Sequence, residues 1–265
     1  MIYSRKSNAP SSQPVSQPRP IRPKHDRPDN EQPSRRLRIV LYSHDTMGLG
    51  HKRRNLLIAQ TLGASTLDAD ILLISGMRDA SDTPTPKGVD TLTLPALHKC
   101  ADGHYQSRHL ALGLDEIISL RSKIILEAIK SFGPDVIIID NVPRGAVQEL
   151  NPTLEYLYVA KKLRCRNDKP YTHCILGLRD VLDTPEVIKR SWEKARNIEA
   201  IRRYYDAVWV YGDAQLYDIR TEIDFPDDII QKMQPLGYLD QRARLSFITP
   251  RQDSLEPLHL SDKDN

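Results

Sequence analysis

The stretch "RIVLYSHDTMGLGHKRRNLLIAQTL", from Arg38 to Leu62, combines the signals of a strand, a turn and a helix. A continuous apolar run ends in a polar turn with two glycines, and a segment with helical spacing follows it. This helix opens with Lys52, Arg53 and Arg54, although the dipole of a helix favours Asp or Glu in the first turn. We therefore expect a negatively charged group to bind at the start of this helix.

The alternation of apolar strands and helical segments continues along the chain. Helices are expected at 51–62, 114–133, 152–163 and 185–203, with shorter ones further on. Five more apolar runs are typical of strands: "ADILLISG" (69–76), "VDTLTLP" (89–95), "DVIIID" (135–140), "THCILGL" (172–178) and "AVWVYG" (207–212). Buried strands separated by helices predict an α/β fold, namely a Rossmann-like, doubly wound, mostly parallel sheet covered on both faces.

Both ends of the chain are polar and show no hydrophobic period. Residues 1–36 are rich in Pro, Ser, Gln and Arg, and they hold too few apolar side chains to offset the entropy of ordering. The segment 243–265 has the same character. We therefore predict a disordered tail over 1–36, one domain over 37–242, and a second disordered tail over 243–265.

Charge and composition narrow the classes of partner and compartment. The formal net charge is +3, but residues 1–36 hold eight Lys and Arg against three acidic residues, which leaves −2 for the remainder. The expected domain has no basic excess, so we expect no nucleic-acid partner. No apolar stretch approaches the roughly 18–20 residues of a membrane span. The cysteines Cys100, Cys165 and Cys174 form no metal or disulfide pattern, and no signal peptide is visible, so a cytoplasmic protein is expected.

Polar residues follow several of the predicted strands. In an open parallel sheet the carboxyl ends of the strands meet at one edge, where ligands bind. Any one of these residues is most simply a helix cap, but their number at one edge predicts a binding site. The candidates are His44 and Asp45 after the first strand, Asp140, Asn141 and Arg144 after "DVIIID", and Arg179 and Asp180 after "THCILGL".

The turn before the first helix favours an anion over a dinucleotide. Gly48 and Gly50 let the backbone approach a ligand closely. However, Arg53 occupies the place of the third glycine of the dinucleotide fingerprint, so a nicotinamide dehydrogenase is disfavoured. His51 is the candidate general base, with Asp140 holding its tautomer. The simpler interpretation is a capping histidine.

The segment "HKCADGHYQSRH" (98–109) contains several potential metal ligands, but their spacing fits no standard structural zinc pattern. We therefore expect no metal and no resident cofactor. We expect a loop here that contacts substrate through Tyr105 and Arg108.

Several blocks together give the chain a family resemblance. "RIVLYSHDTMGLGHKRRNLLIAQTL", "PDVIIIDNVPRGAVQEL", "LGLRDVLDTP", "RRYYDAVWVYGD" and "GYLDQR" resemble the N-terminal domain of predicted bacterial glycosyltransferases related to glycosyltransferase family 28. The resemblance covers about 38–242. It implies the GT-B architecture, in which the N-terminal domain binds the acceptor and a C-terminal domain binds the nucleotide sugar. It also places Gly48, Gly50 and His51 in a glycine-rich loop near the point of transfer. Met47 and Leu49 interrupt that loop, which departs from the family pattern.

Three hypotheses for function are open, of which the resemblance implies the first. The first is the acceptor-binding half of an inverting, metal-independent glycosyltransferase, truncated and inactive without a donor-binding domain from a separate polypeptide. Its partners would be a sugar or lipid-linked acceptor and, at most, a peripheral membrane contact. The second is a non-catalytic module or pseudoenzyme that keeps the anion site. The third is a Rossmann-type nucleotide-binding enzyme of another class.

Overall fold

The computed structural model describes residues 35–44, 50–76, 86–167 and 169–242. A compact unit begins at Arg36, one residue before the predicted start of the domain. Both expected tails lie almost entirely outside the described residues, so their predicted disorder stays a prediction. No helix among the described segments is long and apolar enough to cross a membrane.

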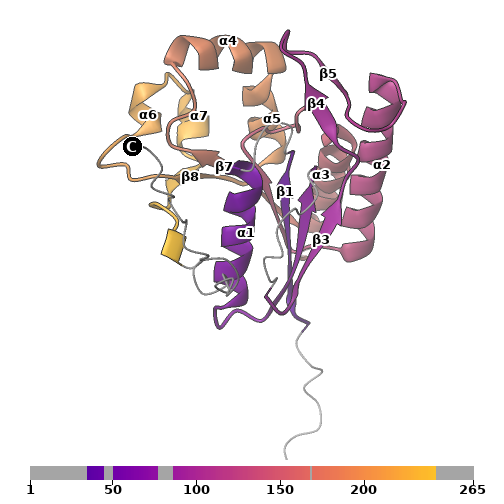
Figure 1. The fold of residues 1–265 in the computed structure, drawn as a ribbon. Helices are drawn as coiled ribbons and strands as arrows, with labels where there is room; N and C mark the ends of the chain where they lie inside the picture. The colour runs from indigo at the N-terminus through magenta and orange to yellow at the C-terminus, as the bar shows by residue number, and fades with distance from the viewer. Residues whose placement is uncertain (1–34, 45–49, 77–85, 168, 243–265) are drawn as a thin grey trace, which may run out of the picture. The chain divides into compact units, whose positions relative to one another are not determined.

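Seven parallel strands form the central sheet (Figure 1), and this confirms the predicted fold class. Their order in the sheet is β3-β2-β1-β6-β7-β8-β9. All six pairings between neighbours are parallel. The strands are β1 (Leu37–Ser43), β2 (Ala69–Ser75), β3 (Val89–Thr93), β6 (Val136–Asp140), β7 (His173–Arg179), β8 (Ala207–Tyr211) and β9 (Met233–Pro235).

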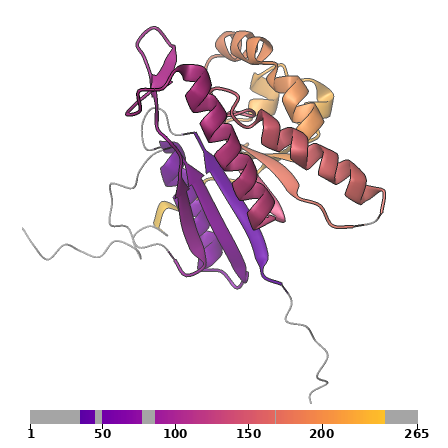
Figure 2. The ribbon, with the colours of Figure 1, turned by 90° about the vertical axis from the view of Figure 1, so that its right-hand side faces the viewer.

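Alternate side chains of β1 enter two different cores, because successive residues of a strand point to opposite faces. Ile39 and Leu41 pack with Ile58 of helix α1 (Gly50–Gly63) on one face. Val40 and Tyr42 join the core on the other face. That second core also takes apolar residues from several helices, among them α2 (Leu114–Phe132), α3 (Asn151–Cys165) and α5 (Asn197–Tyr204). In Figure 2, α2 and α3 lie in front of the sheet.

Helix α2 has a typical N-cap and a typical C-cap. The Glu116 carboxylate accepts a hydrogen bond from the Gly113 N–H at 2.9 Å, and Asp115 adds a second negative charge in the first turn. Gly133 ends the helix at φ 59°, a left-handed conformation that glycine adopts without steric penalty. By contrast, the first turn of α1 contains no acidic residue. The first turn of α1 instead holds the cations Lys52 and Arg53.

Three elements differ from the prediction. The expected helix over 185–203 is two helices, α4 (Pro185–Ala195) and α5, because Arg196 between them adopts φ 52°. The expected loop after β3 contains a small antiparallel hairpin of β4 (Leu97–Lys99) and β5 (Tyr105–Ser107). The third difference is β9, a three-residue strand at one edge of the sheet that was not predicted. The short helices α6 (Ile219–Glu222) and α7 (Asp227–Ile230) precede it.

Candidate functional site

The strand order reverses between β1 and β6. The chain moves from β1 to β2 and β3 on one side, then crosses to β6 and continues to β9 on the other. In open α/β sheets this switch point leaves a crevice at the carboxyl ends of the two strands. Helix α1 begins shortly after β1, and Asp140 is the last residue of β6. The fold therefore brings the start of α1 and Asp140 to the same crevice.

His51, Asp140 and Arg54 form a hydrogen-bonded group at this point. The Nδ1 atom of His51 lies 2.6 Å from Oδ2 of Asp140. Arg54 donates from Nη1 to Oδ1 of the same carboxylate at 2.5 Å. His51 and Arg54 lie one turn apart on α1, so both reach one carboxyl group from the same helix face.

The burial of this group decides its chemistry. The Asp140 side chain is only 1% exposed, whereas that of His51 is 22% exposed. A buried carboxylate needs compensation, and Arg54 supplies the opposite charge. An ionised carboxylate can only accept hydrogen bonds, so Nδ1 of His51 carries the proton. In the neutral ring this arrangement leaves the lone pair on Nε2, where a substrate proton can be received.

Tyr211, the last residue of β8, contacts Arg54 of this group. It was not identified from the sequence. The Arg54 guanidinium lies 5.5 Å from the centre of the Tyr211 ring, a cation–π contact. Burial raises the pKa of the Tyr211 phenol well above its ordinary value, and the negative charge of Asp140 acts in the same direction. Its hydroxyl is buried and has no hydrogen-bond partner among the described residues. The signal for it was its place at the carboxyl end of β8.

His44 lies beside His51, as expected for a residue at the exit of β1. The two ring centroids are 4.7 Å apart, and His44 is 8% exposed. Gly76, which follows β2, lets the backbone pass close to this histidine. A Cβ at Gly76 would lie 2.3 Å from the carbonyl oxygen of His44, so only glycine fits there.

The cations of α1 divide into three environments. Arg54 has an internal partner in Asp140, which accounts for this charge without a bound anion. Lys52 is buried, at 9% exposure, and only Arg53 is exposed. The anion expected at this helix therefore stays a prediction, with Arg53 as its accessible cation. Gly50 is the first residue of α1, and Asp45 and Gly48 lie outside the described residues.

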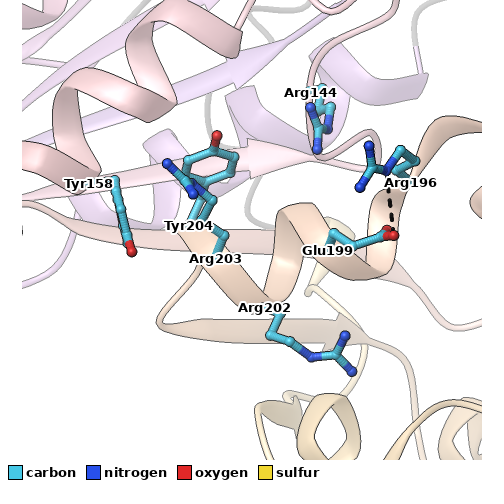
Figure 3. Close-up of a pocket in the computed structure, with 7 residues that line it drawn as sticks. All are labelled: Arg144, Tyr158, Arg196, Glu199, Arg202, Arg203 and Tyr204. Carbon is cyan, nitrogen blue, oxygen red and sulfur yellow. Dashed lines mark ion pairs between the residues drawn. The ribbon is translucent and has the colours of Figure 1, made fainter.

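The two other candidate residues after β6, Asn141 and Arg144, have different surroundings. Asn141 adopts φ 65° and donates its N–H to the Gly177 carbonyl at 2.7 Å, which turns the chain sharply after Asp140. Arg144 lies further along this turn and lines a pocket with residues of α5 (Figure 3). No hydrogen bond or ion pair among the described residues joins Arg144 to His51 or Asp140.

Arg179 and Asp180 form a separate polar group beyond β7. Arg179 is exposed and donates from Nη2 to the Leu182 carbonyl at 3.0 Å. Asp180 accepts a hydrogen bond from the Tyr238 hydroxyl at 2.8 Å. A Cβ at Gly212 would lie 2.4 Å from the Cβ of Asp180, so these two strand exits are in close contact. This group shares the sheet edge with His51, but the described contacts do not join the two.

A second arginine–carboxylate group is completely buried and was not predicted. The side chains of Arg121 and Glu149 are 0% exposed and form an ion pair at 2.9 Å. Tyr42 donates its hydroxyl proton to Glu149 at 2.8 Å. Arg121 also donates to the Pro95 carbonyl at 2.6 Å. The group therefore ties α2 to β1 and to the chain segments that follow β3 and β6.

The segment 98–109 gives no support to a metal site. Within the described parts of the chain, no three His, Cys, Asp or Glu side chains are grouped so that they could hold a metal ion. His104 pairs with Asp102 at 3.2 Å, and both side chains are largely exposed. Tyr105 belongs to β5. The substrate contacts expected of Tyr105 and Arg108 stay predictions.

Comparisons with known proteins give distant structural likenesses. No protein-family model matches the sequence, and no curated protein matches it. A sucrose-phosphate synthase from Thermosynechococcus elongatus is 12% identical with a TM-score of 0.40, over 76% of this chain and 48% of that one. A UGT transferase from Siraitia grosvenorii, solved with UDP, is 12% identical with a TM-score of 0.44, over 82% and 53%.

A glycosyltransferase from Rickettsia africae is 13% identical with a TM-score of 0.29, over 81% of this chain and 71% of that chain. The chain thus spans about half the length of the synthase and of the UGT transferase. At this level of identity the likenesses concern the fold alone.

Proposed function

We propose that this chain supplies the acceptor-binding half of a nucleotide-sugar-dependent glycosyltransferase, with His51 as general base. The observation that carries the proposal is the 2.6 Å contact between His51 Nδ1 and the buried Asp140 carboxylate at the switch point. A histidine whose Nδ1 is held by a carboxylate presents its other nitrogen to a substrate. The resemblance of the sequence blocks to glycosyltransferases related to family 28 supports the reaction class.

In the proposed reaction an acceptor hydroxyl donates a hydrogen bond to Nε2 of His51. As the oxygen attacks the anomeric carbon of the donor sugar, its proton passes to Nε2, and the bond from the sugar to the nucleotide diphosphate breaks. The electron pair of that bond leaves with the diphosphate. Asp140 keeps the imidazole oriented and stabilises the imidazolium that forms. Attack on the face opposite the leaving group inverts the anomeric configuration.

Arg54 and Tyr211 act as positioning residues in this proposal. Arg54 pairs with the second oxygen of Asp140, so the carboxylate stays fixed in its buried position. The Tyr211 ring supports the Arg54 guanidinium from the sheet side. The exposed Arg53 and the N–H groups at the start of α1 would attract an anionic part of the acceptor. The donor sugar would be held by a second domain, on this or another polypeptide, since transfer needs both substrates in one near-attack geometry.

The experiment is a transfer assay in which the chain is combined with a candidate donor-binding domain, radiolabelled UDP-sugars and lipid-diphosphate-linked sugar acceptors. His51→Gln should lower kcat by roughly 10²- to 10⁴-fold with little change in KM, because the acceptor still binds but its proton has no base. The matched control is His173→Gln, an exposed histidine at the first residue of β7. A His51→Gln protein with full transfer activity would refute the base assignment. Acceptor binding without transfer in every pairing would favour the binding-module hypothesis.

A further inference from the structure

A pocket lies between the turn after β6 and the helix α5, on the face of the sheet opposite α1. It has a volume of about 410 Å³, within the roughly 300–1,000 Å³ of small-molecule sites. Four arginines line it: Arg144, Arg196, Arg202 and Arg203. Tyr158, Tyr204 and Glu199 complete the lining (Figure 3). None of these residues belongs to the group around His51.

Three of the four arginines have carboxylate partners. Arg196 pairs with Glu199 at 3.5 Å (Figure 3). Arg202 forms two hydrogen bonds with Asp228. Arg203 donates to both oxygens of Glu155, at 2.8 and 2.9 Å. These three arginines thus pair with three carboxylates, of which only Glu199 lines the pocket.

Arg144 has no carboxylate partner among the described residues. Its one hydrogen bond is a long contact from Nη1 to the Asn151 amide oxygen, at 3.4 Å. Its Nε atom is buried and makes no hydrogen bond with any described residue. The Arg144 side chain as a whole is half-buried, and a ligand oxyanion in the pocket would accept charge-assisted hydrogen bonds from its terminal Nη atoms. In Figure 3 the guanidinium groups of Arg144 and Arg196 are directed into the same space.

Arg196 is held at this position by an unusual backbone. Its φ of 52° and ψ of 43° are left-handed, a conformation that disfavours side chains other than glycine, Asn and Asp. The kink between α4 and α5 places this arginine beside Arg144 instead of continuing the helix. The position therefore carries a cation although glycine would adopt this backbone conformation with less strain.

The tyrosine wall is fixed by its own contacts. Tyr158 and Tyr204 pack edge to face with their centroids 5.9 Å apart, and Arg203 lies over both rings, at 4.6 and 5.4 Å. Tyr204 also donates its hydroxyl proton to Glu155 at 3.0 Å. This wall offers a rigid surface for the uncharged part of a ligand, next to the unsatisfied cation.

We propose that this pocket binds a phosphorylated small molecule, with its oxyanion between Arg144 and Arg196 and its remainder against the tyrosines. The site is separate from the proposed acceptor site and extends the proposed function.

The test is isothermal titration calorimetry, in which inorganic pyrophosphate is added to the whole chain at constant ionic strength. Arg144→Gln should weaken binding about tenfold, the loss expected when one charge-assisted contact is removed. Arg190→Gln, on the exposed surface of α4, is the matched control and should leave the affinity unchanged. Arg53→Gln reports on the separate anion site proposed at the start of α1, so a loss of binding confined to this variant would assign the pyrophosphate to that site.

A second variant separates binding from folding. Arg196→Gly removes the cation at a left-handed position that glycine prefers, so it should weaken pyrophosphate binding while the thermal midpoint stays level or rises. The proposal is overturned if pyrophosphate gives no saturable binding, or if only Arg53→Gln weakens it. Equal losses for Arg144→Gln and Arg190→Gln would also overturn it, because they would show non-specific attraction to positive charge.

Discussion

Two arginine–carboxylate groups lie near the carboxyl ends of the central strands, and they differ in their access to solvent. The group of Arg121 and Glu149 has no exposed side-chain surface. The group of Arg54 and Asp140 buries the carboxylate equally well but includes His51, which is 22% exposed. An arginine–carboxylate pair thus has two roles in this fold. Where it is sealed it joins segments of the fold, and where a histidine reaches solvent it can serve chemistry.

The largest effect is expected from breaking the sealed pair. Arg121→Met leaves the charge of Glu149 buried without its partner, so the free energy of unfolding should fall by about 3–5 kcal/mol. Urea denaturation measures this change. The matched comparison is Arg121→Met combined with Glu149→Gln, which removes both charges and should recover part of the loss. If Arg121→Met alone is harmless, the buried group does not hold these segments together.

A smaller loss is expected at the open group. Asp140→Asn keeps the shape of the side chain but leaves Arg54 and His51 without a carboxylate, so the free energy of unfolding should fall by roughly 1–3 kcal/mol. The control is Asp68→Asn, which breaks a surface pair with Arg36 in which Asp68 is 77% exposed. That substitution should change stability by about 1 kcal/mol or less. Equal losses in the two variants would show that burial of Asp140 does not set its role.

The third prediction uses pH, and it involves a tyrosine from each group. Burial raises the pKa of Tyr42, which contacts Glu149, and of Tyr211, which lies beside Asp140. A raised folded-state pKa gives stability that is complete below the unfolded value of 10.0 and is lost as pH rises above it. Each phenol should remove up to about 1.4 kcal/mol of stability per pH unit above 10.

Tyrosinate absorbance provides the measurement. Burial raises the pKa of Tyr42, Tyr205 and Tyr211, so these three should ionise only as the protein unfolds. Tyr42→Phe and Tyr211→Phe should each remove one late step from the titration curve. A smooth titration of all eleven tyrosines in the folded protein would contradict the burial of these two.

The core of the fold was predictable because its signals are local. β1 and β6 are continuous apolar runs, and the arrangement of parallel strands follows from the helices between them. The approach of His51 to Asp140 was also expected, because both residues leave the sheet at one edge. That edge is a property of the topology, so it could be inferred without side-chain coordinates.

The parts that were missed depend on contacts between distant residues. Arg121 has the sequence context of a solvent-facing helix residue, and only Glu149, 28 positions later, explains its burial. The break between α4 and α5 at Arg196 could not be predicted, because no glycine or proline lies at this position. Tyr211 resembles an ordinary strand residue until Arg54 is placed over its ring. Arg144 was grouped with Asp140 because they are close in sequence, but the sharp turn at Asn141 carries it to the α5 pocket.

The central claim is that Asp140 fixes the proton of His51 on Nδ1 and leaves Nε2 for a substrate. The direct measurement is a ¹⁵N-correlated NMR spectrum of the His51 side chain at alkaline pH, where the ring is neutral, in the natural protein and in Asp140→Asn. We predict the Nδ1–H tautomer in the natural protein and its loss or mixture with the other tautomer in the variant. An Nε2–H tautomer in the natural protein, or identical spectra in the two proteins, would contradict the account.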